Sequence, residues 1–308
     1  MSHFFSISQL TSKLFHLKSP ENMTNLANLS WKRLLMCRPT HFDVIHKGHN
    51  AYMTMKEPVD KPLAMKQWEG VKSTFESIGV KVDVIENEPG QVDQVFCANC
   101  ALVWGGTALI SHMHNPPRRA ESQPTLEWFK ERNFKVYDGR AHGMNLEGCG
   151  DFAYNYDRKH AYLGYGFRTD KEAYHLVKDV IDFTGTQFHS LRLVSELCYH
   201  LDTAMLNLSK GHALVFPPAF DTESYNLIKE VNGEENIIKI SQEDCVNNFV
   251  PNAIPVQDGD NHYIVGMAFT PELHEKLTDL GYKVLLTPYQ EFRKSGGSIR
   301  CSVLDIGI

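Results

Sequence analysis

Gly296-Gly297-Ser298-Ile299-Arg300-Cys301-Ser302-Val303-Leu304 lies near the end of the sequence and joins a glycine turn to an apolar, strand-like run. Cys301 stands where the predicted loop becomes the predicted strand. A cysteine in this position can be a buried filler, because a free thiol packs as a small apolar group. It can also be a nucleophile, and it then needs a histidine to transfer protons and a carboxylate to orient that histidine.

Two upstream segments contain such partners for Cys301. The first, Leu146-Glu147-Gly148-Cys149-Gly150-Asp151, sets acids among glycines, and the second is His200-Leu201-Asp202-Thr203. If the second segment is a strand, His200 and Asp202 face the same side and reach one pocket, because side chains alternate along a strand. The sequence therefore predicts a Cys, His and carboxylate arrangement assembled from distant segments.

Alternating strands and helices fill the chain after residue 30. A strand-helix-strand unit recurs about every fifty residues, which predicts repeated modules around a centre rather than one open sheet. The predicted helices cover residues 62–79, 119–134, 172–183, 224–231 and 271–280. The predicted strands cover residues 33–37, 81–85, 101–104, 108–111, 135–137, 152–154, 161–163, 189–194, 213–216, 237–240, 263–265 and 283–286.

The composition is that of an ordinary soluble globular protein of 308 residues with a net charge of −6. This charge gives no reason to expect nucleic acid or an anionic membrane as a partner. No apolar run is long enough for a transmembrane helix. Seven cysteines, an odd number, favour a reducing compartment over a disulfide scaffold, so we expect a cytoplasmic protein.

Residues 1–30 form an expected N-terminal tail. Residues 2–20 contain lysines, no acid and apolar residues at roughly helical spacing, as mitochondrial presequences do, but they lack arginine. A disordered tail and a targeting segment that would make the protein mitochondrial both stay open. We expect residues 31–308 to form a single α/β catalytic domain, because no Pro-, Gly- or Ser-rich linker divides them.

The motifs of this chain resemble those of the guanidine-modifying superfamily, and they stand in the same order. They are Asp93-Gln94-Val95-Phe96-Cys97-Ala98-Asn99, Glu147-Gly148-Cys149-Gly150-Asp151, His200-Leu201-Asp202 and the Gly-Gly turn before Cys301. The superfamily includes dimethylarginine dimethylaminohydrolases, arginine deiminases, arginine dihydrolases and amidinotransferases, and the chain looks most like the first branch. The resemblance covers residues 32–304 and implies a five-fold pseudo-symmetric α/β propeller, the pentein fold.

The resemblance implies that Cys301, His200 and Glu147 are catalytic and that no cofactor or metal is needed. A guanidinium carbon is a poor electrophile, so attack on it needs a thiolate, and only a few per cent of free Cys is thiolate at neutral pH. We expect Cys301 to form a covalent S-alkylthiouronium. His200 then protonates the leaving amine and activates water. Glu147 either orients His200 or holds the guanidinium.

Asn99 departs from the pattern of deiminases and dimethylarginine hydrolases, where the matching residue is usually Asp. An amide offers a donor and an acceptor but no charge. It suits a neutral urea-like product held for a second hydrolysis, and arginine dihydrolases have Asn in this motif. A neutral drift from Asp to Asn is the alternative. The resemblance to arginine deiminases and amidinotransferases implies that Asp202 contacts the guanidinium, which favours arginine-like substrates.

Three further residues match positions that hold the two ends of an amino-acid substrate. Asp93 corresponds to the residue that binds the α-amino group. Arg118 and Arg168 correspond to residues that bind the α-carboxylate, for which the fork-shaped guanidinium is well suited. Arg119 competes with Arg118, and the sequence leaves that choice open.

The expected function is Cys-dependent hydrolysis of guanidino C–N bonds in arginine or methylated arginine. Its small-molecule partner is then a guanidino amino acid, and a homo-oligomer stays open. The alternatives are an arginine dihydrolase or deiminase, an amidinotransferase that passes the same thiouronium to an amine, and a non-catalytic propeller that only binds.

Overall fold

The computed structural model describes residues 31–46, 49–53 and 55–307. The tail or targeting segment that we expect at residues 1–30 lies outside this part of the chain. The predicted mixed α/β fold is confirmed, since the described strands form five three-stranded sheets. In the described part, no helix is both long and apolar enough to cross a membrane.

Each sheet repeats one pattern, which the third along the chain illustrates. Its first strand, β6 (Phe152–Tyr154), pairs antiparallel with β7 (His160–Tyr165) through a short turn. The helix α5 (Ala173–Val180) then returns the chain so that β8 (Gln187–Arg192) pairs parallel with β7. A parallel pair needs such a crossover helix. The predicted strand-helix-strand unit is therefore present, and one extra strand precedes it.

Three other sheets follow the same order of strand, strand, helix, strand. They consist of β3 (Ala101–Trp104), β4 (Thr107–Ile110), α4 (Ser122–Lys130) and β5 (Lys135–Asp138); β9 (Met205–Asn207), β10 (Ala213–Val215), α6 (Thr222–Asn232) and β11 (Ile237–Lys239); and β12 (Ile254–Asp258), β13 (Asn261–Gly266), α7 (Pro271–Asp279) and β14 (Lys283–Leu286).

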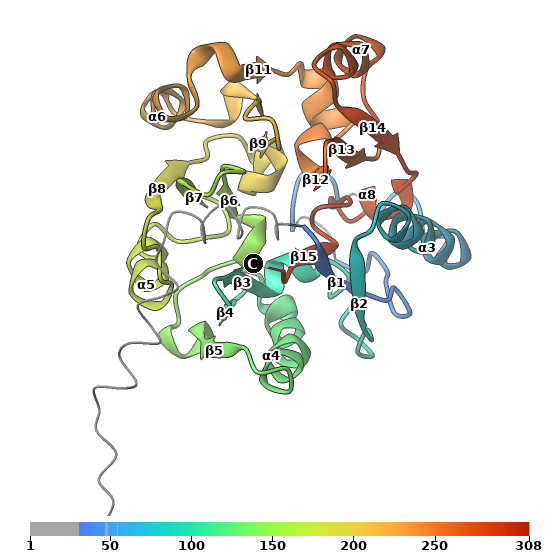
Figure 1. Cartoon of the computed structure of the whole chain (residues 1–308). Helices are drawn as coiled ribbons and strands as arrows, with labels where there is room; N and C mark the ends of the chain where they lie inside the picture. Colours follow the sequence, from blue (N-terminus) through green and yellow to red (C-terminus); the bar gives the residue numbers. More distant parts are fainter. Residues whose placement is uncertain (1–30, 47–48, 54, 308) are drawn as a thin grey trace, which may run out of the picture.

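The remaining sheet joins the beginning and the end of the described chain. Here β1 (Arg33–Cys37), α3 (Lys61–Ser77) and β2 (Lys81–Ile85) supply the unit, and the last strand, β15 (Val303–Asp305), pairs antiparallel with β1. In Figure 1 the helices α3 to α7 lie around the outside, and β3, β6, β9, β12 and β15 lie toward the centre. The C-terminal stretch therefore brings β15, which follows Cys301 in the chain, toward the middle of the molecule.

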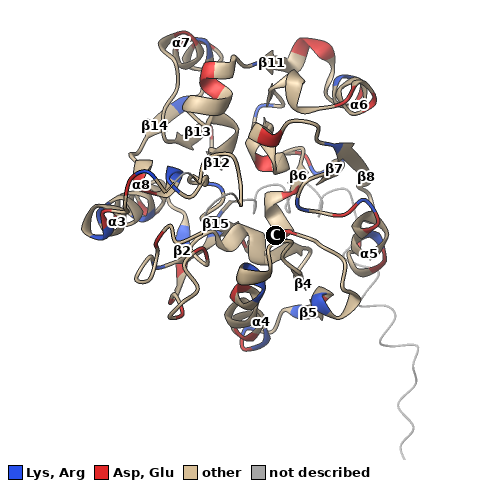
Figure 2. Cartoon of the chain, turned by 180° about the vertical axis from the view of Figure 1, so that it is seen from behind, with Lys and Arg blue, Asp and Glu red and all other residues tan. Residues whose placement is uncertain are grey.

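The outer helices are amphipathic, and α3 is an example. The side chain of Asp60 caps its first turn by accepting from the backbone N–H of Leu63. Trp68, Val71 and Phe75, which recur at helical spacing, are buried. Leu63, in the first turn, is 39 % exposed. Figure 2 shows charged residues mainly along these outer helices and few on the strands.

A short turn precedes the inner strand of each sheet, and these turns position the candidate site. They are η2 (Cys97–Cys100) before β3, η5 (Gly148–Gly150) before β6, η7 (Leu201–Thr203) before β9, η11 (Val250–Asn252) before β12, and the turn at residues 299–302 before β15. Asn99, Asn252 and Cys301 each stand two residues before an inner strand. Equivalent backbone positions in three of the sheets thus carry different side chains, two asparagines and a cysteine.

Candidate active site

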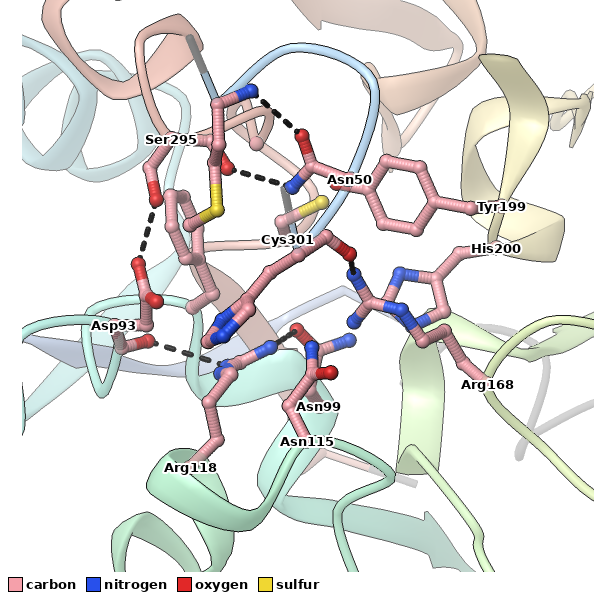
Figure 3. A pocket seen from close by; sticks show the side chains of 14 residues that line it. Asn50, Asp93, Asn99, Asn115, Arg118, Arg168, Tyr199, His200, Ser295 and Cys301 are labelled. Atoms are coloured by element: carbon pink, nitrogen blue, oxygen red, sulfur yellow. Dashed lines mark hydrogen bonds between the residues drawn. The ribbon is translucent and has the colours of Figure 1, made fainter. Parts of the chain in front are cut away.

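A small polar pocket lies where these turns meet. Figure 3 shows that side chains from segments far apart in the sequence surround it. The predicted residues that line it are Asp93, Asn99, Arg118, Arg168, His200 and Cys301. Glu147 and Asp202, the other two predicted residues, contact wall residues from behind, so all eight belong to one cluster.

Cys301 lies at the pocket wall and is only 2 % exposed. Its thiol donates to Oδ2 of Asp202 at 3.4 Å, and its sulfur accepts from Nδ2 of Asn252 at 3.1 Å. Burial and the Asp202 carboxylate raise the pKa of the Cys301 thiol. Burial also raises the pKa of Asp202 to about 7, although Arg300 opposes this shift. The thiol is therefore protonated at neutral pH in the absence of a cation beside it.

Asn252 is a site residue that the sequence analysis missed. Its Oδ1 accepts from the backbone N–H of Cys301 at 3.1 Å, while its Nδ2 donates to the sulfur and, at 3.2 Å, to the carbonyl of Asp202. One buried amide therefore fixes the position of the sulfur and supplies a donor to it. The repeat could have revealed this residue, because Asn252 precedes β12 as Cys301 precedes β15.

Replacing Asn252 with alanine is expected to slow alkylation of Cys301 by iodoacetamide by about 10- to 100-fold at fixed pH. The thiolate loses a charge-assisted hydrogen bond, which is worth roughly 1.5–3 kcal/mol. The measurement is the alkylation rate against pH, with Asn247→Ala as the control because Asn247 is exposed on the preceding segment. Equal rates for wild type and Asn252→Ala across the pH range would contradict this role.

His200, at the pocket wall, and Glu147, behind it, form a directly bonded pair. Nε2 of His200 lies 2.8 Å from Oε2 of Glu147, and both side chains are buried. Arg168 donates to the same oxygen at 3.0 Å, and the backbone N–H of His114 donates to Oε1 at 3.1 Å. Burial alone would raise the pKa of Glu147, but Arg168, His200 and Arg118 together lower it well below its usual range. Glu147 therefore remains a carboxylate.

The geometry differs from the prediction around His200 in one respect. Residues 201–203 form a 3₁₀ turn, not a strand, so His200 and Asp202 do not face the same side. His200 bonds Glu147, whereas Asp202 bonds Cys301. The tight turn therefore places His200 at the pocket wall and Asp202 behind it, in contact with Cys301.

The two arginines that were predicted for a carboxylate both line the pocket. Arg118 donates to Oε2 of Glu121 at 2.9 Å and to Oδ1 of Asn99 at 3.3 Å. Arg168 donates to the carbonyl of His49 at 2.7 Å in addition to Glu147. Arg119, the competing candidate, is exposed and donates to the carbonyl of Met113. The structure therefore brings Arg118 into the cluster and leaves Arg119 outside it.

Several buried polar atoms of the cluster have no hydrogen-bond partner within the described residues. They include Oδ2 of Asp93, Nδ2 of Asn99, Nδ1 of His200 and Oδ1 of Asp202. The other carboxylate oxygen of Asp93 accepts from Oγ of Ser295 at 2.6 Å, which fixes this side chain. A buried polar atom without a partner is costly. These four atoms leave both donors and acceptors of the cluster available to a polar ligand.

The sequence matches the family model of eukaryotic N,N-dimethylarginine dimethylhydrolases over residues 38–308. This chain belongs to that family. The match includes every predicted site residue, since they lie between residues 93 and 301.

Two relatives of this dimethylarginine dimethylhydrolase family member are named for different activities. The chain is 33 % identical over 274 residues to the bifunctional arginine dihydrolase/ornithine cyclodeaminase ArgZ of Synechocystis sp., which covers 89 % of this chain and 37 % of ArgZ. It is 30 % identical over 277 residues to the N(G),N(G)-dimethylarginine dimethylaminohydrolase of Mycobacterium tuberculosis, with 89 % of this chain and 86 % of that protein covered. The chain thus spans little more than a third of ArgZ.

Solved structures resemble this family member closely. A variant of the N-terminal domain of ArgZ, covalently bound to a reaction intermediate, gives a TM-score of 0.81 at 33 % identity and covers 89 % of this chain and 97 % of its own. A dimethylarginine dimethylaminohydrolase adduct with 4-chloro-2-hydroxymethylpyridine gives a TM-score of 0.70 at 21 % identity, covering 90 % of this chain and 100 % of its own. The second likeness concerns the fold alone.

Proposed function

We propose that this chain hydrolyses a C–N bond in the guanidino group of arginine or a methylated arginine, with Cys301 as the nucleophile. The observation that supports this most is the cluster of the Cys301 thiol, Asp202 and the bonded His200–Glu147 pair at one buried polar pocket. Relatives named for arginine and for dimethylarginine hydrolysis agree with it. In this proposal residues 31–308 form a single domain in which the five sheets close into a pentein propeller around the pocket.

The reaction starts with activation of a buried, protonated thiol. A guanidinium cation beside the sulfur favours the thiolate electrostatically, and Asp202 accepts the hydrogen bond that the thiol donates. The thiol passes its proton to Asp202, and the resulting thiolate of Cys301 attacks the guanidinium carbon to give a tetrahedral adduct. Substrate binding therefore activates the nucleophile.

His200 serves both halves of the reaction. Glu147 is bonded to Nε2, so Nδ1 is the nitrogen that exchanges protons with the pocket. The protonated ring gives a proton to the departing amine and leaves the S-alkylthiouronium on Cys301. The neutral ring then takes a proton from water, which attacks the same carbon and releases a ureido product and the thiolate.

The two ends of the amino acid fit the remaining cluster. The unpaired Oδ2 of Asp93 suits an α-ammonium group. Arg118 and Arg168 each use only some of their five N–H donors on protein partners, so both retain donors for an α-carboxylate. The occupant proposed for the pocket is therefore a guanidino amino acid rather than a simple guanidine.

Mass spectrometry of the products tests this function. Purified protein would be incubated separately with arginine, monomethylarginine and dimethylarginine, with Cys301→Ser as the control. Citrulline plus dimethylamine from dimethylarginine establishes the one-step reaction. Absence of products from all three, with no adduct on Cys301, would overturn the proposal.

A second candidate is the two-step arginine dihydrolase, and Asn99 favours it. Arg118 donates to Oδ1 of Asn99, so the free atom that Asn99 offers the pocket is Nδ2, a donor. A donor suits the carbonyl oxygen of a neutral urea, whereas a guanidinium cation has no acceptor for it. This geometry matches a site that retains the ureido product for a second hydrolysis to ornithine.

Replacing Asn99 with aspartate is expected to stop this reaction at citrulline. The carboxylate holds the guanidinium but repels the urea oxygen, so the ratio of ornithine to citrulline from arginine falls at least roughly tenfold, about 1.4 kcal/mol. Product ratios by mass spectrometry measure this. Asn115→Asp adds the same charge elsewhere on the pocket wall and is the control. If the wild type releases only citrulline, the two-step proposal fails and the one-step function stands.

A further inference from the structure

Two cysteines outside the reaction scheme lie in contact. The Sγ atoms of Cys198 and Cys245 are 3.6 Å apart although 47 residues separate them in sequence, and both residues are buried. Cys198 ends the turn η6 (Glu196–Cys198), and Cys245 lies in the π-helical turn η10 (Glu243–Asn247). A disulfide bond is about 2.05 Å long, so the two sulfurs need to approach by only about 1.5 Å.

The fold holds both cysteines in this position. On one side, Asp244 accepts from the backbone N–H of Thr270 at 2.8 Å and from its hydroxyl at 3.0 Å, which fixes η10. On the other side, the hydroxyl of Tyr52 donates to the carbonyl of Leu197 at 2.9 Å, which fixes η6. Little conformational freedom is left to lose when the two sulfurs join.

Charge around the pair affects how fast it reacts. The hydrogen bond to Cys198 and burial raise the pKa of the Cys245 thiol, and Arg293 opposes them. The guanidinium of Arg293 lies over the rings of Phe249 and Tyr52 and donates to the carbonyl of Val246 at 3.1 Å. Since the thiolate is the reactive form, we expect oxidation over minutes to hours rather than seconds.

We propose that Cys198 and Cys245 form a reversible disulfide that lowers turnover at the neighbouring active site. A peroxide oxidises one thiolate to a sulfenic acid and is itself reduced with loss of water. The second thiol attacks that sulfur and releases another water, so two thiols and one hydrogen peroxide give one disulfide and two waters. A dithiol reverses the reaction by exchange.

The pair is coupled to His200 in two ways. Cys198 stands two residues before His200, so a shift of Cys198 toward its partner pulls this segment. The thiol of Cys245 also donates to the carbonyl of Thr203 at 3.5 Å, and the hydroxyl of Thr203 donates to the carbonyl of His200 at 2.7 Å. A disulfide removes the first of these donors. A displacement of 1 Å at a catalytic group can cost about 10²-fold in rate.

Peptide mapping tests the bond itself, independently of the proposed function. The Cys301→Ser chain would be treated with hydrogen peroxide, digested without reduction and mapped by mass spectrometry. We expect a linked peptide pair that contains Cys198 and Cys245, weighs two hydrogens less than the free peptides and separates with dithiothreitol. Oxidation of the other thiols without this linked pair would overturn the proposal.

Kinetic measurements test whether the disulfide lowers turnover, and this second experiment rests on the proposed function. Peroxide also oxidises Cys301, so the loss of activity in wild type is compared with that in two variants that lack one cysteine of the pair, Cys245→Ala and Cys198→Ser. Cys37→Ala, which removes a buried thiol on β1, is the control. We expect kcat of oxidised wild type and Cys37→Ala to fall about tenfold further than that of the pair variants and to recover with dithiothreitol. Equal losses in all four proteins would overturn the regulatory role.

Discussion

Replacing Cys301 with serine is expected to lower kcat by about 10⁴-fold or more, the scale seen when a nucleophile is removed. A serine hydroxyl still accepts from Asn252 and donates to Asp202, so the pocket keeps its shape. The hydroxyl is much less acidic than the thiol, however, so a bound cation cannot generate an alkoxide at neutral pH. Product formation from arginine and dimethylarginine measures the loss, and calorimetric titration measures binding.

A matched substitution separates chemistry from packing in this experiment. Cys37 is also a fully buried thiol, and Cys37→Ser places the same hydroxyl on β1, away from the pocket. It should keep kcat within a fewfold of wild type. Turnover by Cys301→Ser within tenfold of wild type would rule out Cys301 as the nucleophile.

Glu147→Gln is expected to lower kcat by roughly 10³- to 10⁴-fold, as when an amide replaces the carboxylate that orients a catalytic histidine. The amide cannot stabilise the imidazolium form of His200, and it leaves Arg168 without its counter-charge. Breaking a buried ion pair on one side typically costs 3–5 kcal/mol of stability. Kinetics at several pH values and thermal unfolding measure the two effects separately.

Glu121→Gln is the control for this second prediction. Glu121 is also buried and bonded to an arginine, Arg118, but it makes no hydrogen bond to His200 among the described contacts. We expect it to lower stability and raise KM while kcat changes only a fewfold. Equal losses of kcat in the two variants would mean that buried charge in general, rather than orientation of His200, governs the rate.

The alternation of strands and helices could be read from the sequence because each unit has a strong local signal. Trp68, Val71 and Phe75 recur at helical spacing, and the middle strand β10 is a continuous apolar run. The strand β12 gave no such signal, since it contains Pro255 and ends in polar residues. Proline is tolerated there because β12 is an edge strand of its sheet.

The sequence predicted those site residues that stand in recognisable motifs. Cys301, His200 and Glu147 stand in motifs of a known family, and the structure brings them together. Asn252 stands in no motif that we recognised, and a loop asparagine is common, so only its place in the repeat distinguishes it. The direction in which the Asp202 side chain points depends on a 3₁₀ turn of three residues. Such a turn is too short to produce a periodic pattern in the sequence.

Acid quenching followed by mass spectrometry of the peptide containing Cys301 tests the central claim most directly. Hydrolysis at the guanidine predicts that arginine and dimethylarginine leave the same adduct, arginine less one ammonia, because each loses its own terminal amine. An amidinotransferase would instead leave only the amidino carbon and its nitrogens on the sulfur. An adduct of that kind would move the assignment to amidino transfer. No adduct during turnover, with product still formed, would contradict covalent catalysis by Cys301.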